Sequence, residues 1–478
     1  MSAYVPTIGI ECHVQLKTKT KLFAAVSNDA RAAEPNTLIS HICLGLPGAL
    51  PSLNARAVEL SCKAGFALGV KPQKFSKFDR KHYFYPDLPK GYQISQFSDP
   101  IVIGGHVDIE VDSKTKKIGI VRAHLEEDAG KTTHPAAKDY SLVDLNRAGT
   151  PLLEIVSEPD IHSAKEAKAY AQKLYLLMKY ADISDVDLYH GNMRFDVNVS
   201  VSDDPKKLGT RSETKNLNSF KAVEKTVEYE IKRQTEMLEK GQTIIQETRG
   251  WDDAKQKTTS QRGKEEAHDY RYFPDPDIPP LNLSDEYLEK VKKDFDKKNF
   301  YTIRDKLVSA GHLSTADLDT LFNNPQSVDF AVAVLEKDEA SPGSISKLFD
   351  WLINFIPSFI DDYARLNEAK IDGLLALAKA FDEGRLVSTK AKEGVKELFE
   401  ADTFDADKFI GDNQTLSDED VVEKIVTKII NDNPKAAEDV RRGEMKAVGF
   451  LVGQVMKESK GKADPALAQK LIRKRLKV

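Results

Sequence analysis

The sequence has 478 residues, of which 40% are hydrophobic and 30% are charged, and its formal net charge is −5. This length exceeds one ordinary core, so about two to four domains are expected, and the composition is that of a folded chain. The slight acidic excess excludes a generally basic nucleic-acid-binding protein, so any RNA contact must come from a local patch.

The apolar patterns of the first 280 residues predict short strands mixed with helices. Period-two alternation and apolar runs predict strands at Val5–Leu16, Gly119–His124, Leu152–Val156 and Met193–Val201. Ser163 and Glu166 have capping-box spacing before a helix that runs to about Ala181, and a second helix is predicted from Ser219 to Lys240, with Gly241 ending it. Because strands and helices do not alternate strictly, we expect an α+β fold with a largely antiparallel sheet.

After Pro279 and Pro280 the strand patterns give way to helical spacing. Residues 285–400 are rich in Lys, Glu, Leu and Ala, and the acidic stretch Ala401–Asp420 is interpreted as a linker. The last segment is predicted to be helical. From Arg441 to Val478 it has eleven Lys or Arg residues against three acidic ones, so it is the local basic patch.

The sequence offers no signal for secretion or for a membrane span. Cys12, Cys43 and Cys62 are too few for a disulfide framework and fit a reducing compartment. The N-terminus lacks a secretory signal, and the longest apolar stretch, Trp351–Ile360, is short and broken by Pro357. We therefore expect a cytoplasmic protein without a membrane partner.

Glu11 and His13 stand two residues apart in the first predicted strand. Both side chains therefore lie on one face of that strand. A buried carboxylate needs a partner, and a divalent cation is one; two solvated residues of an edge strand are the alternative.

A second acidic cluster, Glu126, Glu127 and Asp128, precedes Gly130-Lys131-Thr132. A phosphate loop is rejected, because its first glycine would fall at Leu125 and three carboxylates would repel a phosphate. Such carboxylates can hold Mg²⁺, although a solvated acidic turn is the alternative.

Glu154 lies inside the apolar run Leu152–Val156, where an unpaired carboxylate would be costly. It is therefore a candidate metal ligand or acid/base group. Asp196 is a weaker candidate, because its strand face could be solvated.

The segment from Phe78 to Gln93 combines aromatic residues with Lys81 and Lys90. Cations beside aromatic rings suit a nucleotide or the end of an RNA strand. An aromatic loop that packs on the core is an equal alternative.

Ordered blocks along almost the whole chain resemble the B subunits of aspartyl/glutamyl-tRNA amidotransferases. These blocks are Ile8–Leu16, Lys77–Gln96, His124–Lys131, Asp144–Asp160, Gly209–Phe220, Gln246–Arg249, Asp269–Pro276 and Gly443–Lys460. The resemblance implies a glutamine-hydrolysing ligase in which ATP phosphorylates the side-chain carboxylate of misacylated Glu-tRNA(Gln) or Asp-tRNA(Asn). Ammonia from a partner then displaces the phosphate.

The resemblance also implies partners, cofactors and site residues. The partners are a glutaminase of the amidase type (the A subunit) and a small C subunit in a heterotrimer, with misacylated tRNA but no DNA; the cofactors are ATP and Mg²⁺. The implied metal ligands are Glu11, His13, Glu126, Glu127, Glu154 and, less clearly, Asp196. Glu11, His13, Glu127 and Glu154 are implied to be catalytic, and Lys81 and Lys90 to lie near the nucleotide and the inner end of the ammonia tunnel.

The implied architecture is a glutamine-synthetase-like cradle at residues 1–294, a helical domain at 295–405 and a tRNA-contacting helical tail at 406–478. Some family members carry a Cys-x-Cys and Cys-x-x-Cys zinc site. The matching positions here include Ala24, Ala25 and Val26, and then Cys43, so no structural zinc is expected. Two other functions remain open: a tRNA-binding adaptor without catalysis, and a metal-dependent phosphoesterase.

Overall fold

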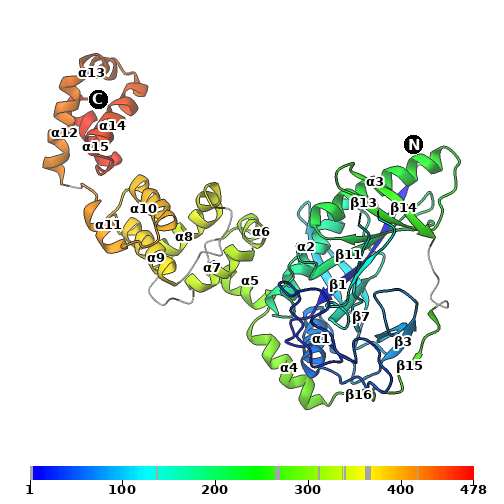
Figure 1. The fold of residues 1–478 in the computed structure, drawn as a ribbon. Helices are drawn as coiled ribbons and strands as arrows, with labels where there is room; N and C mark the ends of the chain where they lie inside the picture. The colour runs from blue at the N-terminus through cyan, green and yellow to red at the C-terminus, as the bar shows by residue number, and fades with distance from the viewer. Residues whose placement is uncertain are drawn as a thin grey trace. The chain divides into compact units, whose positions relative to one another are not determined.

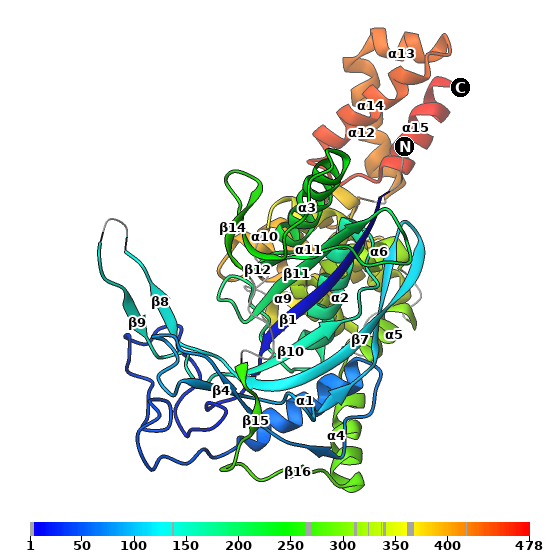
Figure 2. The same cartoon turned by 90° about the vertical axis from the view of Figure 1, so that its right-hand side faces the viewer.

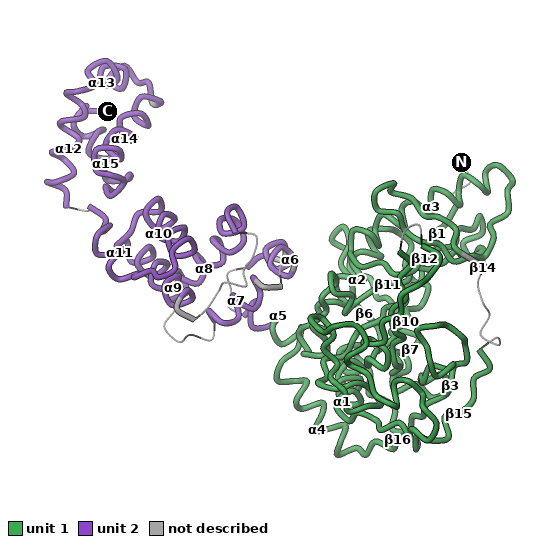
Figure 3. The backbone as a smooth tube through the Cα atoms, in the orientation of Figure 1, with its two compact units in different colours: residues 1–303 green, residues 304–478 purple. Residues whose placement is uncertain are grey.

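A computed structural model describes residues 4–135, 138–263, 270–309, 313–323, 325–335, 337, 341–360, 368–416 and 418–478 (Figure 1). Asp269, which begins one of the resembling blocks, lies outside these residues. The chain divides into two compact units, Met1–Ile303 and Arg304–Val478 (Figure 3). The proposed division into three parts at residues 294 and 405 stays a prediction.

The described strands of the first unit form a twelve-stranded sheet, which is antiparallel except where β12 pairs with β13. Its order is β14-β13-β12-β11-β1-β10-β7-β4-β3-β15, and β5 and β6 also pair with β7. The strands are β1 (Val5–Gln15), β3 (Asp79–His82), β4 (Tyr92–Ser95), β5 (Val102–Ile103), β6 (His106–Val111), β7 (Lys114–Glu127), β10 (Pro151–Ser157), β11 (Met193–Ser202), β12 (Ser212–Leu217), β13 (Glu247–Asp252), β14 (Lys257–Gly263) and β15 (Phe273–Pro274). The expectation of an α+β fold with a largely antiparallel sheet is confirmed.

Two short strand pairs lie outside this sheet. They join β2 (Phe75–Ser76) to β16 (Leu281–Asn282), and β8 (Lys131–Thr133) to β9 (Leu142–Asp144). Figure 2 shows β1, β10 and β7 side by side, with β8 and β9 extending away from the end of β7.

The two faces of the central strands differ in chemistry. Ile8, Ile10, Cys12 and Val14 are at most 1% exposed on one face of β1, while Glu11 and His13 point to the other. The apolar face packs against helices, since α3 lies against β11 and Gln234 of α3 donates to the Val199 carbonyl at 3.0 Å. The other face is left for polar side chains.

The helices of the first unit begin and end where local signals place them. They are α1 (Ala55–Ala67), α2 (Ala164–Tyr180), α3 (Phe220–Glu239) and α4 (Asp285–Lys297). Ser163 accepts from Glu166 N at 3.2 Å and Ser219 from Ala222 N at 3.0 Å, so both predicted helix starts are confirmed. Gly241 has a φ of +68°, as expected just after a helix C-terminus.

The described part of the second unit is helical. Its elements are α5 (Phe300–Ser309, which begins in the first unit), α6 (Thr315–Asn323), α7 (Pro325–Leu335), α8 (Pro342–Asp350), η2 (Trp351–Phe355), η3 (Ile356–Ser358), α9 (Glu368–Asp382), α10 (Ser388–Glu400), α11 (Ala406–Asp412), α12 (Glu419–Asp432), α13 (Pro434–Arg441), α14 (Met445–Glu458) and α15 (Pro465–Leu476). The helices α12 to α15 share a core that includes Val426, Leu451 and Ile472. Among the described helices, none has the length and apolar content of a membrane span.

The interpretation of Ala401–Asp420 as a linker is wrong for Ala406–Asp412 in its middle, which form α11. Asp405 caps this helix by accepting from Lys408 N at 3.0 Å, and Ile410 is only 3% exposed. Phe409 packs so closely against Gly394 of α10 that a Cβ there would lie 2.7 Å from its ring. The acidic residues of this stretch therefore belong to a packed helix: Asp405 caps it, and Asp407 and Asp412 lie on its exposed side.

Candidate metal and nucleotide site

The polar face of the sheet lines a cavity of about 550 Å³. Its walls come mainly from β1, β3, β4, β7, β10, β12, β13 and the segment that contains Tyr270 and Tyr272. Strand register explains the convergence. His13 pairs with Glu154, Glu154 with His124, and Glu11 with Asp196, so side chains distant in sequence meet on one face.

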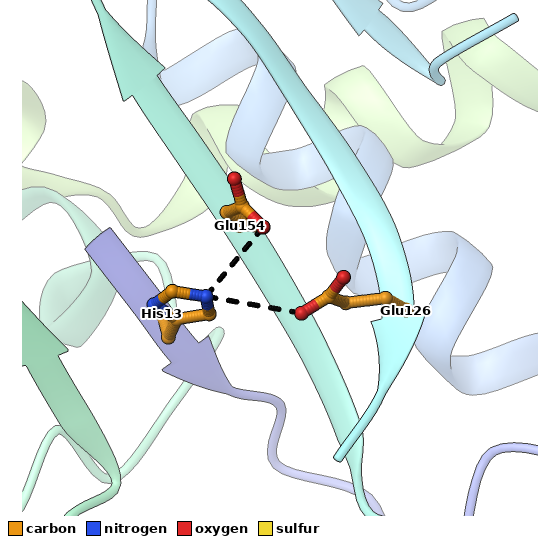
Figure 4. Close-up of side chains that lie close together, drawn as sticks. All are labelled: His13, Glu126 and Glu154. Atoms are coloured by element: carbon orange, nitrogen blue, oxygen red, sulfur yellow. Dashed lines mark ion pairs between the residues drawn. The ribbon is translucent and has the colours of Figure 1, made fainter. Parts of the chain in front are cut away.

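One group of potential ligands consists of His13, Glu126 and Glu154 (Figure 4). His13 Nε2 lies 3.5 Å from Glu154 Oε2 and 3.9 Å from Glu126 Oε1. His124 also lines the cavity, and its Nε2 lies 3.5 Å from an oxygen of each of the two carboxylates. These groups could hold a cation through two carboxylate oxygens and an imidazole nitrogen.

A second group consists of Glu11, Asp196 and Glu213, whose carboxylate oxygens lie within 4.8 Å of one another. Polar neighbours orient them. Asn198 Nδ2 donates to Glu11 Oε1 at 2.9 Å, Asn216 N to Asp196 Oδ1 at 2.8 Å, and Thr248 Oγ1 to Glu213 Oε2 at 3.2 Å. The Lys215 amine lies 3.6 Å from Asp196 and 3.7 Å from Glu213, close enough to neutralise part of their charge.

The charged side chains on this face of the sheet shift the pKa values of its titratable groups. Burial raises the pKa of Glu11, and the nearby charges of Glu154 and Asp196 raise it further. Burial alone would lower the pKa of His13, but a hydrogen bond and the charge of Glu154 outweigh it and raise that pKa to about 9. For Glu154, burial is outweighed by the charges of His124 and His13, which hold its pKa well below the usual range.

The donor set fits hard divalent cations. Carboxylate oxygens dominate both groups, and crowded acidic groups such as Glu11 gain a counter-charge when a cation binds. A protonated His13 cannot be a ligand, so a metal ion would compete with a proton at Nε2.

The predicted site residues fall into two sets. Glu11, His13, Lys81, Glu126 and Glu154 line the cavity, and Asp196 adjoins it through the second group. Burial alone would lower the pKa of Lys81, but the acidic groups of Tyr272, Glu126 and Glu154 outweigh it and raise that pKa.

Glu127 does not join this set, because it follows Glu126 in β7 and so points to the other face of the sheet. There its Oε1 pairs with the Lys90 amine and accepts from Ile94 N at 3.0 Å. Neither Glu127 nor Lys90 lines the cavity, and the roles implied for them, Glu127 as a metal ligand and Lys90 near the nucleotide or the ammonia tunnel, stay predictions.

Sequence reasoning missed Glu213 and His124 as parts of the site. Glu213 lies in one of the resembling blocks, where Ser212-Glu213-Thr214-Lys215 alternates charged and small polar residues, and this alternation was the available signal. His124 stands two residues before the acidic cluster, but it was not predicted to be a site residue. Arg122, Arg211 and Lys215 also line the cavity and were not singled out.

Comparisons with known proteins show the family of this chain. A family model described as "GatB/GatE catalytic domain" matches residues 6–289, and one described as "GatB domain" matches residues 338–476. Proteins named as the B subunit of aspartyl/glutamyl-tRNA(Asn/Gln) amidotransferase from Caldanaerobacter subterraneus subsp. tengcongensis and Thermoanaerobacter pseudethanolicus are each 44% identical to this chain, over 99% of both lengths. One from Coxiella burnetii is 43% identical over 98% of this chain and 99% of its own length.

The chain belongs to the family of amidotransferase B subunits. Both carboxylate groups, from Glu11 to Glu213, fall within the part that matches the family's catalytic domain.

The three cysteines lead to a prediction about zinc. Cys12, Cys43 and Cys62 are all buried and free, and neither group of potential ligands in the described residues includes a thiol. We expect no stoichiometric zinc to survive dialysis of the purified chain, because a closed structural site needs four ligands. Elemental analysis measures this, and one retained zinc per chain would contradict it.

Proposed function

We propose that this chain is the carboxylate-activating subunit of a tRNA-dependent amidotransferase. In the proposed reaction, the side-chain carboxylate of Glu-tRNA(Gln) or Asp-tRNA(Asn) attacks the γ-phosphate of ATP and ammonia then displaces the phosphate. An unactivated carboxylate is a poor electrophile, so phosphorylation must come first. The observation that carries the proposal is a single cavity where two clusters of potential metal ligands and several basic side chains lie together.

The proposed roles follow from the chemistry of these side chains. His13, Glu126 and Glu154, and Glu11, Asp196 and Glu213, would hold divalent cations, and Mg²⁺ there would offset the charge of the triphosphate. Lys81, Arg122 and Arg211 bind phosphate oxygens. His124 keeps Glu126 and Glu154 oriented toward the cavity.

Partners complete the proposal. Glutamine hydrolysis is assigned to an A subunit of the amidase type, which joins this chain and a small C subunit in a cytoplasmic heterotrimer. Glu127 and Lys90, on the other face of the sheet, are candidates for the ammonia path. The glutamine-synthetase-like form of the cradle is part of the same proposal.

The test is glutamine-dependent amidation by the complex that co-purifies with the chain, measured separately on Glu-tRNA(Gln) and Asp-tRNA(Asn). We expect an amidated product that requires ATP. Phosphate release without any tRNA requirement would favour a phosphoesterase. Binding of tRNA without amidation of either substrate would favour an adaptor.

One face of α14 is proposed to contact the tRNA backbone. Lys446, Gly449, Phe450, Gly453 and Lys457 share this face by helical spacing, and all five are exposed. A Cβ added at Gly449 or Gly453 would meet nothing within 4 Å, so packing inside the chain does not require these glycines. Glycine weakens a helix interior, and close approach of a ligand backbone is a reason to keep it.

Replacing Gly449 and Gly453 together by alanine is expected to stabilise α14 by about 2 kcal/mol, at about 1 kcal/mol per glycine, while weakening tRNA binding. The added methyl groups would hold an RNA backbone further away. Urea unfolding and tRNA titration of the full chain measure the two effects. Gly411→Ala, at a similarly open position in α11, is the matched control and should leave tRNA affinity unchanged. Unaltered tRNA affinity in the double variant would remove this face from the proposal.

A further inference from the structure

A buried lysine and a buried cysteine are in contact outside the cavity. Lys21 is 1% exposed and Cys43 is 6% exposed, and the Lys21 amine donates to Cys43 Sγ at 3.7 Å. The same amine donates to the Ala148 carbonyl at 2.6 Å, and Ser40 Oγ donates to Cys43 Sγ at 3.4 Å. The hydrogen bond to Ala148 fixes the nitrogen and the one from Ser40 fixes the sulfur, so both atoms are held beside each other.

The environment of Lys21 is unusual for a lysine. In the described part of the chain its amine has no carboxylate partner within 4.0 Å, so a carbonyl and a thiol serve where an ion pair would be expected. Burial lowers the pKa of Lys21. A larger share of its amine is therefore neutral, and a neutral amine has the lone pair that a nucleophile needs.

This contact joins two segments of the chain, one next to the turn before β10 and one next to Lys90. Leu22 N donates to the Gly149 carbonyl at 2.8 Å, which ties the Lys21 segment to the turn before β10. On the other side, the loop of Cys43 reaches Lys90, since a Cβ at Gly45 would lie 2.7 Å from Lys90 Cγ. A covalent bond between Lys21 and Cys43 would fix this loop against the partner of Glu127.

We propose that Cys43 and Lys21 form a reversible sulfur–nitrogen crosslink when the protein meets hydrogen peroxide. The Cys43 sulfur first attacks a peroxide oxygen and the O–O bond breaks, which leaves a sulfenic acid and one water. The Lys21 nitrogen then attacks the sulfur, the S–O bond breaks, and the departing hydroxide takes a proton from the nitrogen to form a second water. Sulfur loses two electrons and the peroxide gains them.

The surroundings permit both the formation and the reversal of this bond. His41 and Gly45 on either side of Cys43 are exposed, so a local opening of this loop would admit a small oxidant. An added thiol can attack the sulfur, release the lysine amine and form a mixed disulfide, which a second thiol reduces. Oxidation would therefore fix the loop of Cys43 to Lys21, and reduction would release it.

Peptide mapping of the full chain after treatment with hydrogen peroxide tests the proposal. After digestion with trypsin without reductant, we expect a linked peptide pair with the summed mass less two hydrogens and no cleavage after Lys21. Dithiothreitol should abolish this pair. Cys12 and Cys62 are internal controls: both are free and buried, and no hydrogen bond with a lysine is present for either in the described structure, so neither should form a link to lysine.

Lys21→Met provides a second measurement. In this variant Cys43 should stop at the sulfenic acid, which dimedone traps, or proceed to the sulfinic acid. Should the variant fail to fold, mapping of the unaltered chain still decides the question. The proposal is overturned if Cys43 becomes sulfinic while trypsin still cleaves after Lys21, or if Cys43 resists peroxide altogether.

Discussion

Replacing Glu154 by glutamine is expected to lower ATP-dependent phosphorylation of the misacylated tRNA by roughly 10²-fold or more, the loss associated with a major electrostatic stabiliser. Glutamine keeps the size of the side chain but removes the charge that faces His13 and His124 at 3.5 Å. Without it, a cation in this group would lose one of its two carboxylates. The measurement is the single-turnover rate at saturating ATP and tRNA.

Binding of tRNA should be almost unchanged in this variant, because Glu154 lines the cavity and the proposed tRNA contacts lie in the helical tail. Glu158→Gln is the matched control, since Glu158 follows just after the same strand and is exposed. We expect it to react at the normal rate. Near-normal turnover of Glu154→Gln would mean that Glu154 is structural and that the proposed cation site is misplaced.

Removing the chain after Asn413 is expected to weaken tRNA binding by roughly tenfold or more and to flatten its dependence on salt. Contacts with phosphates release counterions, so their loss lowers the slope of affinity against salt concentration. This cut keeps α11, which packs against α10, and removes α12 to α15, which share their own core. A cut at residue 406 would instead strip a packed helix from its neighbours.

The single-turnover rate on tRNA that still binds should be similar in the truncated chain, since no proposed ligand is removed. A charge control comes from the tail itself. Lys474 and Arg475 lie 3.6 Å and 3.4 Å from Glu419 and Glu423, so their neutralisation should cost less affinity than neutralising Lys446 and Lys457. Equal affinity and an equal salt slope after truncation would leave the tail without an RNA role.

Local patterns predicted the elements whose signals are contained in a few neighbouring residues. Val5–Leu16 and Met193–Val201 were found because these strands alternate apolar and polar residues along the chain, which puts the apolar ones on one buried face. The start of α2 at Ser163 was found because a cap is a contact between residues three apart. β7 is longer than the predicted Gly119–His124, because its first half is Lys-rich and pairs only with β6, where solvent removes the apolar signal.

The composition of the site could be predicted only in part, because its assembly depends on pairing between distant strands. Glu11 and Glu154 were found because a carboxylate inside an apolar run is unusual. Glu213 was missed because its strand is polar on both sides, and its relevance comes from pairing with Asn198 of β11, which brings it near Asp196 and Glu11. Composition likewise could not distinguish a linker from α11, whose apolar residues Phe409 and Ile410 are few but buried or packed.

Glu126 and Glu127 point to opposite faces of β7, and this arrangement limits where residues can be inserted into the chain or deleted from it. A slip of one residue in β7 would turn its side chains to the opposite face, so that neither carboxylate would keep its position and at most one could take the position of the other. Both environments would then be lost at once, although no amino acid had been substituted. Insertions and deletions should therefore be tolerated at the β6–β7 turn near Asp112 and Ser113, where both residues have positive φ, and rejected between Ala123 and Asp128.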